Sequence, residues 1–360
     1  MKNWFRKISL ITALLPAVFA LSFTACDNPV FEDEGVCIVT YNLRFVYDMN
    51  LKWADAFPSE VHSVHLYAFD NRGLFVKEFT ANGQPVDLEG YTMQLELEPG
   101  RYTLVAWCGM ENEGETVKSF TVPVPVVGST RIEELTCALN TKPVSRAGVY
   151  SDERLRFLYH GKLDVDLPKV YNGNFDYTMY LTKDTNHIRI ILQQLSGEDM
   201  NPAEFDFTIE DTNTLLGHDN SMRSPEVVAY RPWSVVSGEA GMVPEESESG
   251  SLVYAKGVVA DLSTSRLMAA NKDDMRLTVT GTDGNLVARV PLLQYALLSR
   301  EYYEMAYGHP LTDQEFLDRE DEYVFTFFLD ASQRWIEMHI NILSWRVVVH
   351  NYEADSGTQS

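Results

Sequence analysis

The chain has 360 residues, which is enough for about two domains of ordinary size. Hydrophobic residues make up 45% of it and aromatic residues 12%, so the composition is that of a globular protein and excludes disorder as a description of the whole. The 52 acidic residues outnumber the 29 basic ones and give a net charge of −23, which excludes binding to the phosphate backbone of nucleic acids.

Residues 1–25 have the layout of a secretory signal peptide. Lys2, Arg6 and Lys7 precede an apolar run over residues 8–20, and small residues form a cleavage site after it. Pro16 interrupts the apolar run, which argues against a membrane-spanning helix. Removal of this segment takes away three positive charges and lowers the net charge from −23 to −26. Charge alone therefore cannot hold the mature protein to an anionic membrane.

The residue that follows the signal is a cysteine. The run Ser22-Phe23-Thr24-Ala25-Cys26 resembles the lipobox of bacterial lipoproteins, in which the cysteine receives acyl chains such as palmitate and becomes the mature N-terminus. Two or more buried chains anchor a protein firmly, at ~0.8 kcal/mol per buried CH₂. We therefore predict that Cys26 is the lipid-attachment site and that it holds the protein to the outer membrane. The alternative is an ordinary signal peptide that is cut near a cysteine by chance.

Residues 26–35 form a short acidic tether that contains Glu32, Asp33 and Glu34. These residues could be a solvated linker only. They also resemble the acidic export signals that follow the lipidated cysteine in lipoproteins of Bacteroidota, which would place the protein on the outward-facing side of the membrane. At the other end, residues 354–360 form a polar tail.

Three cysteines remain once Cys26 is acylated, namely Cys37, Cys108 and Cys137. An odd number leaves at least one thiol free or paired between molecules. An exported protein could form one disulfide among them, and the three possible pairings stay open. Cys37 and Cys108 both lie in apolar surroundings and could equally be small buried hydrophobic residues.

The pattern of residues 36–145 predicts a first β-sandwich domain. Apolar residues alternate with more polar ones from Cys37 to Tyr47, which is typical of a strand with one buried face. Val61–Phe69 and Leu74–Phe79 flank a turn sequence and predict a hairpin. Over Tyr91–Glu98 the odd-numbered residues are apolar and should be buried, whereas the even-numbered residues are polar and should be exposed.

Residues 146–353 predict a second β-sandwich domain, with the boundary within Thr141–Glu153, where periodicity is weak. A capping box of Thr312 and Glu315 predicts one short helix, and Gly238–Ser251 looks like a solvated loop. The predicted strands are Phe157–Leu167, Tyr177–Leu181, Ile188–Leu195, Phe205–Ile209, Leu252–Ala260, Arg276–Thr280, Leu286–Val290, Tyr323–Leu329 and Trp335–Val349.

Runs of residues in both halves of the mature chain carry a family resemblance. They are Glu60–Gly73, Leu95–Trp107, Pro291-Leu292, Glu315–Tyr323, and Ile340–Ile342 with Trp345. Together and in this order they resemble the FimB-like fimbrial anchor subunit family, the minor fimbrillin lipoproteins of Bacteroidota. The resemblance covers nearly the whole mature chain, which makes it more specific than any one run.

The resemblance implies an all-β fold of two transthyretin-like β-sandwich domains in tandem, with a short helix in the second. Subunits of this class polymerise when a strand of one completes the sheet of another, so the expected partners are fimbrial shaft subunits. An anchor subunit keeps its lipid, holds the fibre to the outer membrane and limits the fibre's length. Shaft subunits are cleaved after an arginine. Here Arg44 lies inside a predicted strand, which favours an anchor over a shaft subunit and leaves a tip subunit as an open alternative.

We predict no catalytic residue, no cofactor and no metal site, and therefore no enzyme. The sequence has no Gly-x-Ser-x-Gly elbow, phosphate loop, Cys-x-x-Cys pair or His-Glu-x-x-His motif. The closest histidines, His62 and His65, are three residues apart in a predicted strand and should point to opposite faces, where they cannot share an ion.

A surface glycan-binding lipoprotein is the alternative function, and the tryptophans suggest it. Trp53 and Trp233 lie beside predicted loops, where an indole ring could stack on a sugar. A glycan-binding protein should bind a polysaccharide when isolated, whereas an anchor subunit should co-purify with a fibre.

Overall fold

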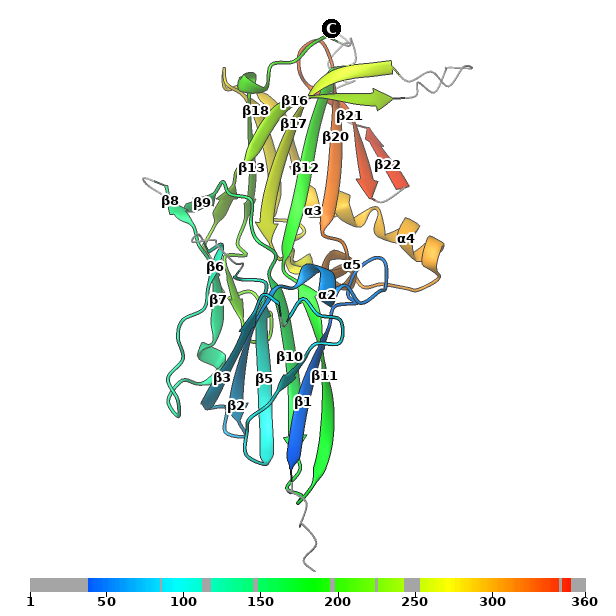
Figure 1. Ribbon diagram of the computed structural model, residues 1–360. Coiled ribbons are helices and arrows are strands. Elements are labelled where there is room, and N and C mark those ends of the chain that lie inside the picture. The colour runs from blue at the N-terminus through cyan, green and yellow to red at the C-terminus, as the bar shows by residue number, and fades with distance from the viewer. Residues whose placement is uncertain are drawn as a thin grey trace, which may run out of the picture. The chain divides into compact units, whose positions relative to one another are not determined.

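The computed structural model confirms the prediction of an all-β protein (Figure 1). Cys26, Cys37, Glu32–Glu34 and the tail 354–360 lie outside the described residues. No helix in the described part of the chain is long and apolar enough to cross a membrane. The described residues are 38–84, 86–111, 118–144, 148–194, 198–223, 226–242, 253–342 and 345–350.

The first sheet has seven strands in the order β3-β2-β5-β10-β11-β1-β4. Residues 38–40 group with 170–174 in one compact unit, and the rest of the described chain forms a second unit. The strands of this sheet are β1 (Val39–Val46), β2 (Ser63–Asp70), β3 (Phe75–Asn82), β4 (Thr92–Gln94), β5 (Gly100–Cys108), β10 (Tyr159–Leu167) and β11 (Gly173–Lys183).

The predicted alternation of the first strand is confirmed. Tyr41, Leu43 and Phe45 are buried in β1, whereas the side chain of Arg44 between them is exposed and pairs with Asp55 at 3.1 Å. Alternate side chains of a strand point to opposite faces, so this segment has one face toward the core.

Two further local predictions of the first half are confirmed. The predicted hairpin is β2 paired with β3, and Asp70 closes its turn by accepting hydrogen bonds from the backbone N–H groups of Arg72 and Leu74. Over residues 91–98, Met93 and Leu95 are buried and the even-numbered residues are exposed as predicted, whereas Tyr91 and Leu97 are only half-buried and only Thr92–Gln94 pair as a strand.

The remaining strands form three sheets. A six-stranded sheet has the order β16-β17-β12-β20-β21-β22, in which β12 runs parallel to β20 and antiparallel to β17. Its strands are β12 (Thr185–Gln194), β16 (Ser234–Met242), β17 (Val253–Ser265), β20 (Glu322–Leu329), β21 (Trp335–Ile342) and β22 (Trp345–His350). A second six-stranded sheet contains, in order, β19 (Leu286–Pro291), β18 (Arg276–Gly281), β13 (Phe205–Asp211), β15 (Val228–Tyr230), β9 (Val149–Ser151) and β8 (Lys142–Pro143). A three-stranded sheet contains β14 (Leu215–Gly217), β7 (Thr136–Leu139) and β6 (Phe120–Thr121).

The helices are short and gather late in the chain. The predicted capping box is half realised, because the Thr312 hydroxyl accepts a hydrogen bond from the Glu315 N–H, whereas the Glu315 carboxylate binds Arg319 instead. The sequence predicts one helix in the second half of the chain, and the described residues there contain three. The helices are α2 (Phe57–Glu60), α3 (Leu292–Leu297), α4 (Arg300–Tyr307) and α5 (Asp313–Arg319), and the 3₁₀ turns are Ile132–Glu134, Pro202–Glu204 and Ala269–Asn271.

Two further expectations from the sequence concern a loop and the domain boundary. The loop expected over Gly238–Ser251 is partly a strand, because β16 continues to Met242 in a hairpin with β17. The first sheet includes β10 and β11, which follow the predicted boundary within Thr141–Glu153. A sandwich that ended at residue 145 would lack these two inner strands. Where the domains divide stays a prediction.

Replacement of Leu43 by alanine should lower the free energy of unfolding by about 2–5 kcal/mol, because Leu43 has no exposed surface and the change leaves a cavity. Chemical denaturation of the full chain, followed by tryptophan fluorescence, measures this. Arg44→Ala is the matched control in the same strand, where an exposed ion pair contributes at most about 1 kcal/mol. Equal losses in the two variants would contradict the assigned strand orientation.

Candidate functional site

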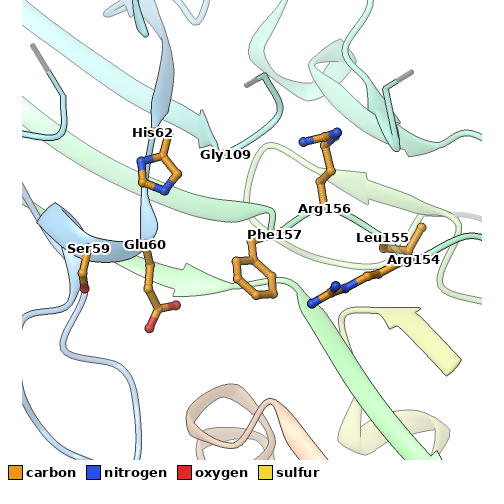
Figure 2. Close-up of a pocket in the computed structure, with 8 residues that line it drawn as sticks. All are labelled: Ser59, Glu60, His62, Gly109, Arg154, Leu155, Arg156 and Phe157. Atoms are coloured by element: carbon orange, nitrogen blue, oxygen red, sulfur yellow. The ribbon is translucent and has the colours of Figure 1, made fainter. Parts of the chain in front are cut away.

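A polar groove surrounds Phe157. Three adjoining cavities of about 460, 360 and 50 Å³ all have this residue in their walls. Figure 2 shows the Phe157 ring between Glu60 on one side and Arg154 and Arg156 on the other. The ring is 45% exposed, which is unusual for a large apolar side chain inside a cavity. We call this set of cavities the Phe157 groove.

A buried lysine forms the floor of the groove. The ammonium group of Lys183 lies 3.7 Å from the centre of the Phe157 ring and 3.2 Å from a carboxylate oxygen of Glu60, and it also contacts Asp321. The hydroxyl group of Tyr159 donates to the same Glu60 oxygen at 2.9 Å. Burial and the neighbouring Glu60 carboxylate raise the pKa of Tyr159 far above its usual value, so it remains a hydrogen-bond donor.

The segment before α2 is held to the C-terminal helices by one arginine and one tryptophan. The guanidinium group of Arg319 lies 3.5 Å from the centre of the Trp53 ring and donates to the carbonyl oxygens of Asp48 and Asn50. The Trp53 indole N–H donates to the Tyr303 hydroxyl at 2.7 Å. In Figure 1, α4 and α5 lie next to this segment. These contacts hold Trp53 in place by its edge and one face.

Glu320 is a buried carboxyl group in the wall of the largest cavity. One of its oxygens accepts a hydrogen bond from the Glu322 N–H at 2.8 Å, and the other has no partner among the described residues. Burial, with a further contribution from the adjacent Asp321, raises the pKa of Glu320 to about 8. The group therefore holds a proton at neutral pH and can donate a hydrogen bond.

Trp233 is half-buried and lies beside Arg154, a residue of the groove wall. The guanidinium group of Arg154 is 5.4 Å from the centre of its ring, and the ring of His187 is 6.1 Å away. Thus Trp53 and Trp233 each touch an arginine that lines the Phe157 groove, although the structure does not bring the two indoles into contact with each other. Trp53 is nevertheless 41% exposed, and ligand stacking at either indole stays a prediction.

No sequence motif identified the groove residues as a functional site, namely Glu60, Phe157, Lys183 and Glu320. One signal was available, because the charged pair Lys183-Asp184 interrupts a long strand-forming stretch. In such a place a charged residue is buried only when it has a partner.

The candidate histidines and the two described cysteines either pair with a carboxylate or are buried. His62 pairs with Asp87 at 2.8 Å and His65 with Glu78 at 3.1 Å, and the described residues contain no group of metal-binding side chains. Cys108 and Cys137 are buried free thiols, and burial raises their pKa.

The Glu320→Gln variant should lose less stability than the wild type when the pH rises from 5 to 8. The pKa of Glu320 is about 8 in the folded state against an ordinary value of 4.5, so its contribution is complete below about pH 4.5 and is lost as the pH rises through 8. Denaturation at several pH values should show a several-fold smaller change in the unfolding equilibrium constant. Glu322→Gln, at an exposed neighbour, is the control. Parallel pH profiles for Glu320→Gln and the wild type would refute the prediction.

Comparisons with known proteins place the chain among fimbrial proteins. The sequence model of the fimbrillin-A associated anchor proteins Mfa1 and Mfa2 matches residues 33–351. A candidate adhesin from Bacteroides thetaiotaomicron is 31% identical, with a TM-score of 0.70 over 85% of this chain and 96% of that chain. A candidate polysaccharide-binding protein from the same bacterium is 26% identical, with a TM-score of 0.70 over 88% and 99%.

A third solved structure shares the fold at lower identity. It is the fimbrial anchor protein Mfa2 from Porphyromonas gingivalis, which is 15% identical, with a TM-score of 0.61 over 87% of this chain and 99% of that chain. A comparison with curated protein sequences gave no match. On the match over residues 33–351, the chain belongs to the family of fimbrillin-A associated anchor proteins Mfa1 and Mfa2.

Proposed function

We propose that this protein is a fimbrial anchor subunit, attached to the outer membrane by lipid on Cys26, that holds a fimbrial fibre to the cell and limits its length. The observation that carries the proposal is the family match over residues 33–351, which begins within the acidic tether directly after the lipobox cysteine. Glu32, Asp33 and Glu34 are part of the same proposal as a surface-export signal. The proposal also includes the assignment of two tandem domains of the transthyretin-like type.

The place of β1 supports an anchor that keeps its N-terminal segment. β1 lies between β11 and β4 as an inner strand, and Arg44 is paired with Thr92 in the ladder, where a protease cannot easily reach the backbone. Loss of β1 would take Tyr41, Leu43 and Phe45 out of the core, and the burial of each side chain contributes ~1.5–3 kcal/mol to stability. That total is comparable with the whole stability of a typical domain, ~5–15 kcal/mol.

The outer strands of the six-stranded sheet are the suitable edges for strand complementation by a shaft subunit. β16 and β22 end the strand order of that sheet among the described residues, and they are nine and six residues long. An edge of this kind offers backbone donors and acceptors to an incoming strand. β4, an edge of the first sheet, pairs over three residues only.

Glycan binding is the second candidate function. It is favoured by the exposed Phe157 ring beside charged hydrogen-bonding groups, and by the relative of 26% identity that is described as a candidate polysaccharide-binding protein. Sugar sites commonly combine an aromatic face with planar polar side chains. The two functions are compatible, because an anchor subunit at the cell surface could also bind a polysaccharide.

The Cys26→Ser variant should not be acylated and should leave the membrane fraction, because the acyl chains are the firm anchor in this proposal and the net charge of the chain is negative. Fractionation of cells followed by immunoblotting measures this. A Cys37→Ser variant is the control and should stay membrane-bound. Retention of the Cys26→Ser protein in salt-washed membranes would contradict the lipid anchor.

The mature protein in assembled fibres should start at acylated Cys26, because cleavage after Arg44 would separate the folded part from its lipid. Mass spectrometry of the basal component of isolated fibres identifies the N-terminus. A main species that starts at Phe45 would instead make this protein a shaft subunit.

A further inference from the structure

The turn between β10 and β11 exposes apolar side chains beside the first described residue of the chain. Tyr171 is 90% exposed and Val170 is 42% exposed, and Ile38 at the start of the described chain is 56% exposed. The N–H of Gly173 donates to the Ile38 carbonyl oxygen at 3.3 Å, and the turn and residues 38–40 belong to one compact unit. The exposed side chains are therefore held close to the point where the segment from Cys26 joins the fold.

The chemistry of this turn suits the headgroup region of a membrane. Leu167–Phe175 contains no acidic residue, although the chain has 52, and its single charged side chain is the exposed Lys169. Asp166, just before the turn, lies 4.0 Å from Arg101, which offsets its charge. Tyrosine and lysine combine an apolar body with a polar end, and they are enriched where lipid chains meet headgroups.

The length of the tether brings this turn to the membrane, and this step rests on the proposed lipid anchor. The twelve residues 26–37 can span at most roughly 40 Å even when fully extended. Ile38, and the turn hydrogen-bonded to it, therefore stay within a short distance of the bilayer that holds the acyl chains.

We propose that Ile38, Val170 and Tyr171 form a membrane foot that inserts into the headgroup region, with Lys169 beside the lipid phosphates. A lipid alone fixes the position of the protein and leaves its orientation free. A second contact, formed by the described residues themselves, restricts the tilt of this part of the chain against the bilayer. The partner of this surface is a lipid bilayer.

Site-specific labelling of the acylated full-length protein in vesicles tests the foot. Tyr171→Cys, in a Cys37→Ser background, would carry an environment-sensitive fluorophore, since the buried Cys108 and Cys137 do not react readily. The vesicles contain phosphatidylethanolamine and phosphatidylglycerol with lipids spin-labelled near the headgroup. The matched control is Tyr180→Cys, an exposed tyrosine within β11 and outside the proposed foot, with 62% of its surface exposed. We expect several-fold stronger quenching at position 171 than at position 180.

A second variant tests whether the foot acts as a unit. Val170→Ser with Tyr171→Ser should reduce the quenching of a label at Ile38→Cys, whereas Tyr180→Ser should leave it unchanged. Equally weak quenching at 171 and 180 in protein that stays membrane-bound through Cys26 would overturn the foot and leave the anchor intact. Protection of position 171 only after shaft subunits are added would assign the surface to a protein partner and would also overturn it. Acylated protein that does not bind the vesicles would refute the lipid anchor together with the foot.

Discussion

Two adjacent buried ionisable residues, Lys183 and Asp184, are the constraint on which the arrangement of the second compact unit depends. Burial raises the pKa of Asp184 to about 7, so its carboxyl group is partly ionised at neutral pH. The two residues lie where β11 ends and β12 begins, and the two side chains have separate partners. Lys183 contacts Glu60 and Asp321, whereas Asp184 accepts a hydrogen bond from Asn220 at 2.8 Å and lies 3.7 Å from Arg266. A buried charge that loses its partner costs about 3–5 kcal/mol. The segments that supply these partners are therefore fixed at the point where the chain passes from the seven-stranded sheet into the six-stranded sheet that contains β12.

The Phe157 groove follows from the same requirement. The partners of Lys183 come from α2 and from the start of β20, so these elements meet around its ammonium group. The ammonium group covers one part of the Phe157 ring, and the rest stays exposed to the cavities. Nearby, Arg319 satisfies the carbonyl groups of the segment before α2 and stacks on Trp53, which explains why this indole has a structural contact where the sequence suggested a ligand-binding one.

The features that the sequence predicts correctly are local. The alternation of β1, the β2–β3 hairpin and the cap of α5 each depend on residues within about twenty positions of one another, and side-chain period and turn chemistry suffice to find them. The lipobox at Cys26 is a local pattern as well, and the lipid attachment that it implies stays a prediction. The pairing of β5 with β10 joins residues about 50 to 70 positions apart, and Lys183 is 123 positions from Glu60 and 138 from Asp321. Period and composition carry no information on such pairings, so the groove could not be predicted.

An anchor that keeps its lipid must carry mechanical load through its first strand. In the proposed anchor the chain from Cys26 enters the fold at β1, so a pull on the fibre would reach the membrane through that strand. β1 is suited to this because it is an inner strand with three buried large side chains, and an outer strand would have half as many backbone hydrogen bonds to resist the pull. From the first sheet the covalent path continues along β11 through Lys183-Asp184 into β12, the strand between β17 and β20. The buried charges at that step resist separation, because pulling the sheets apart would leave each charge without its partner in a site that excludes water.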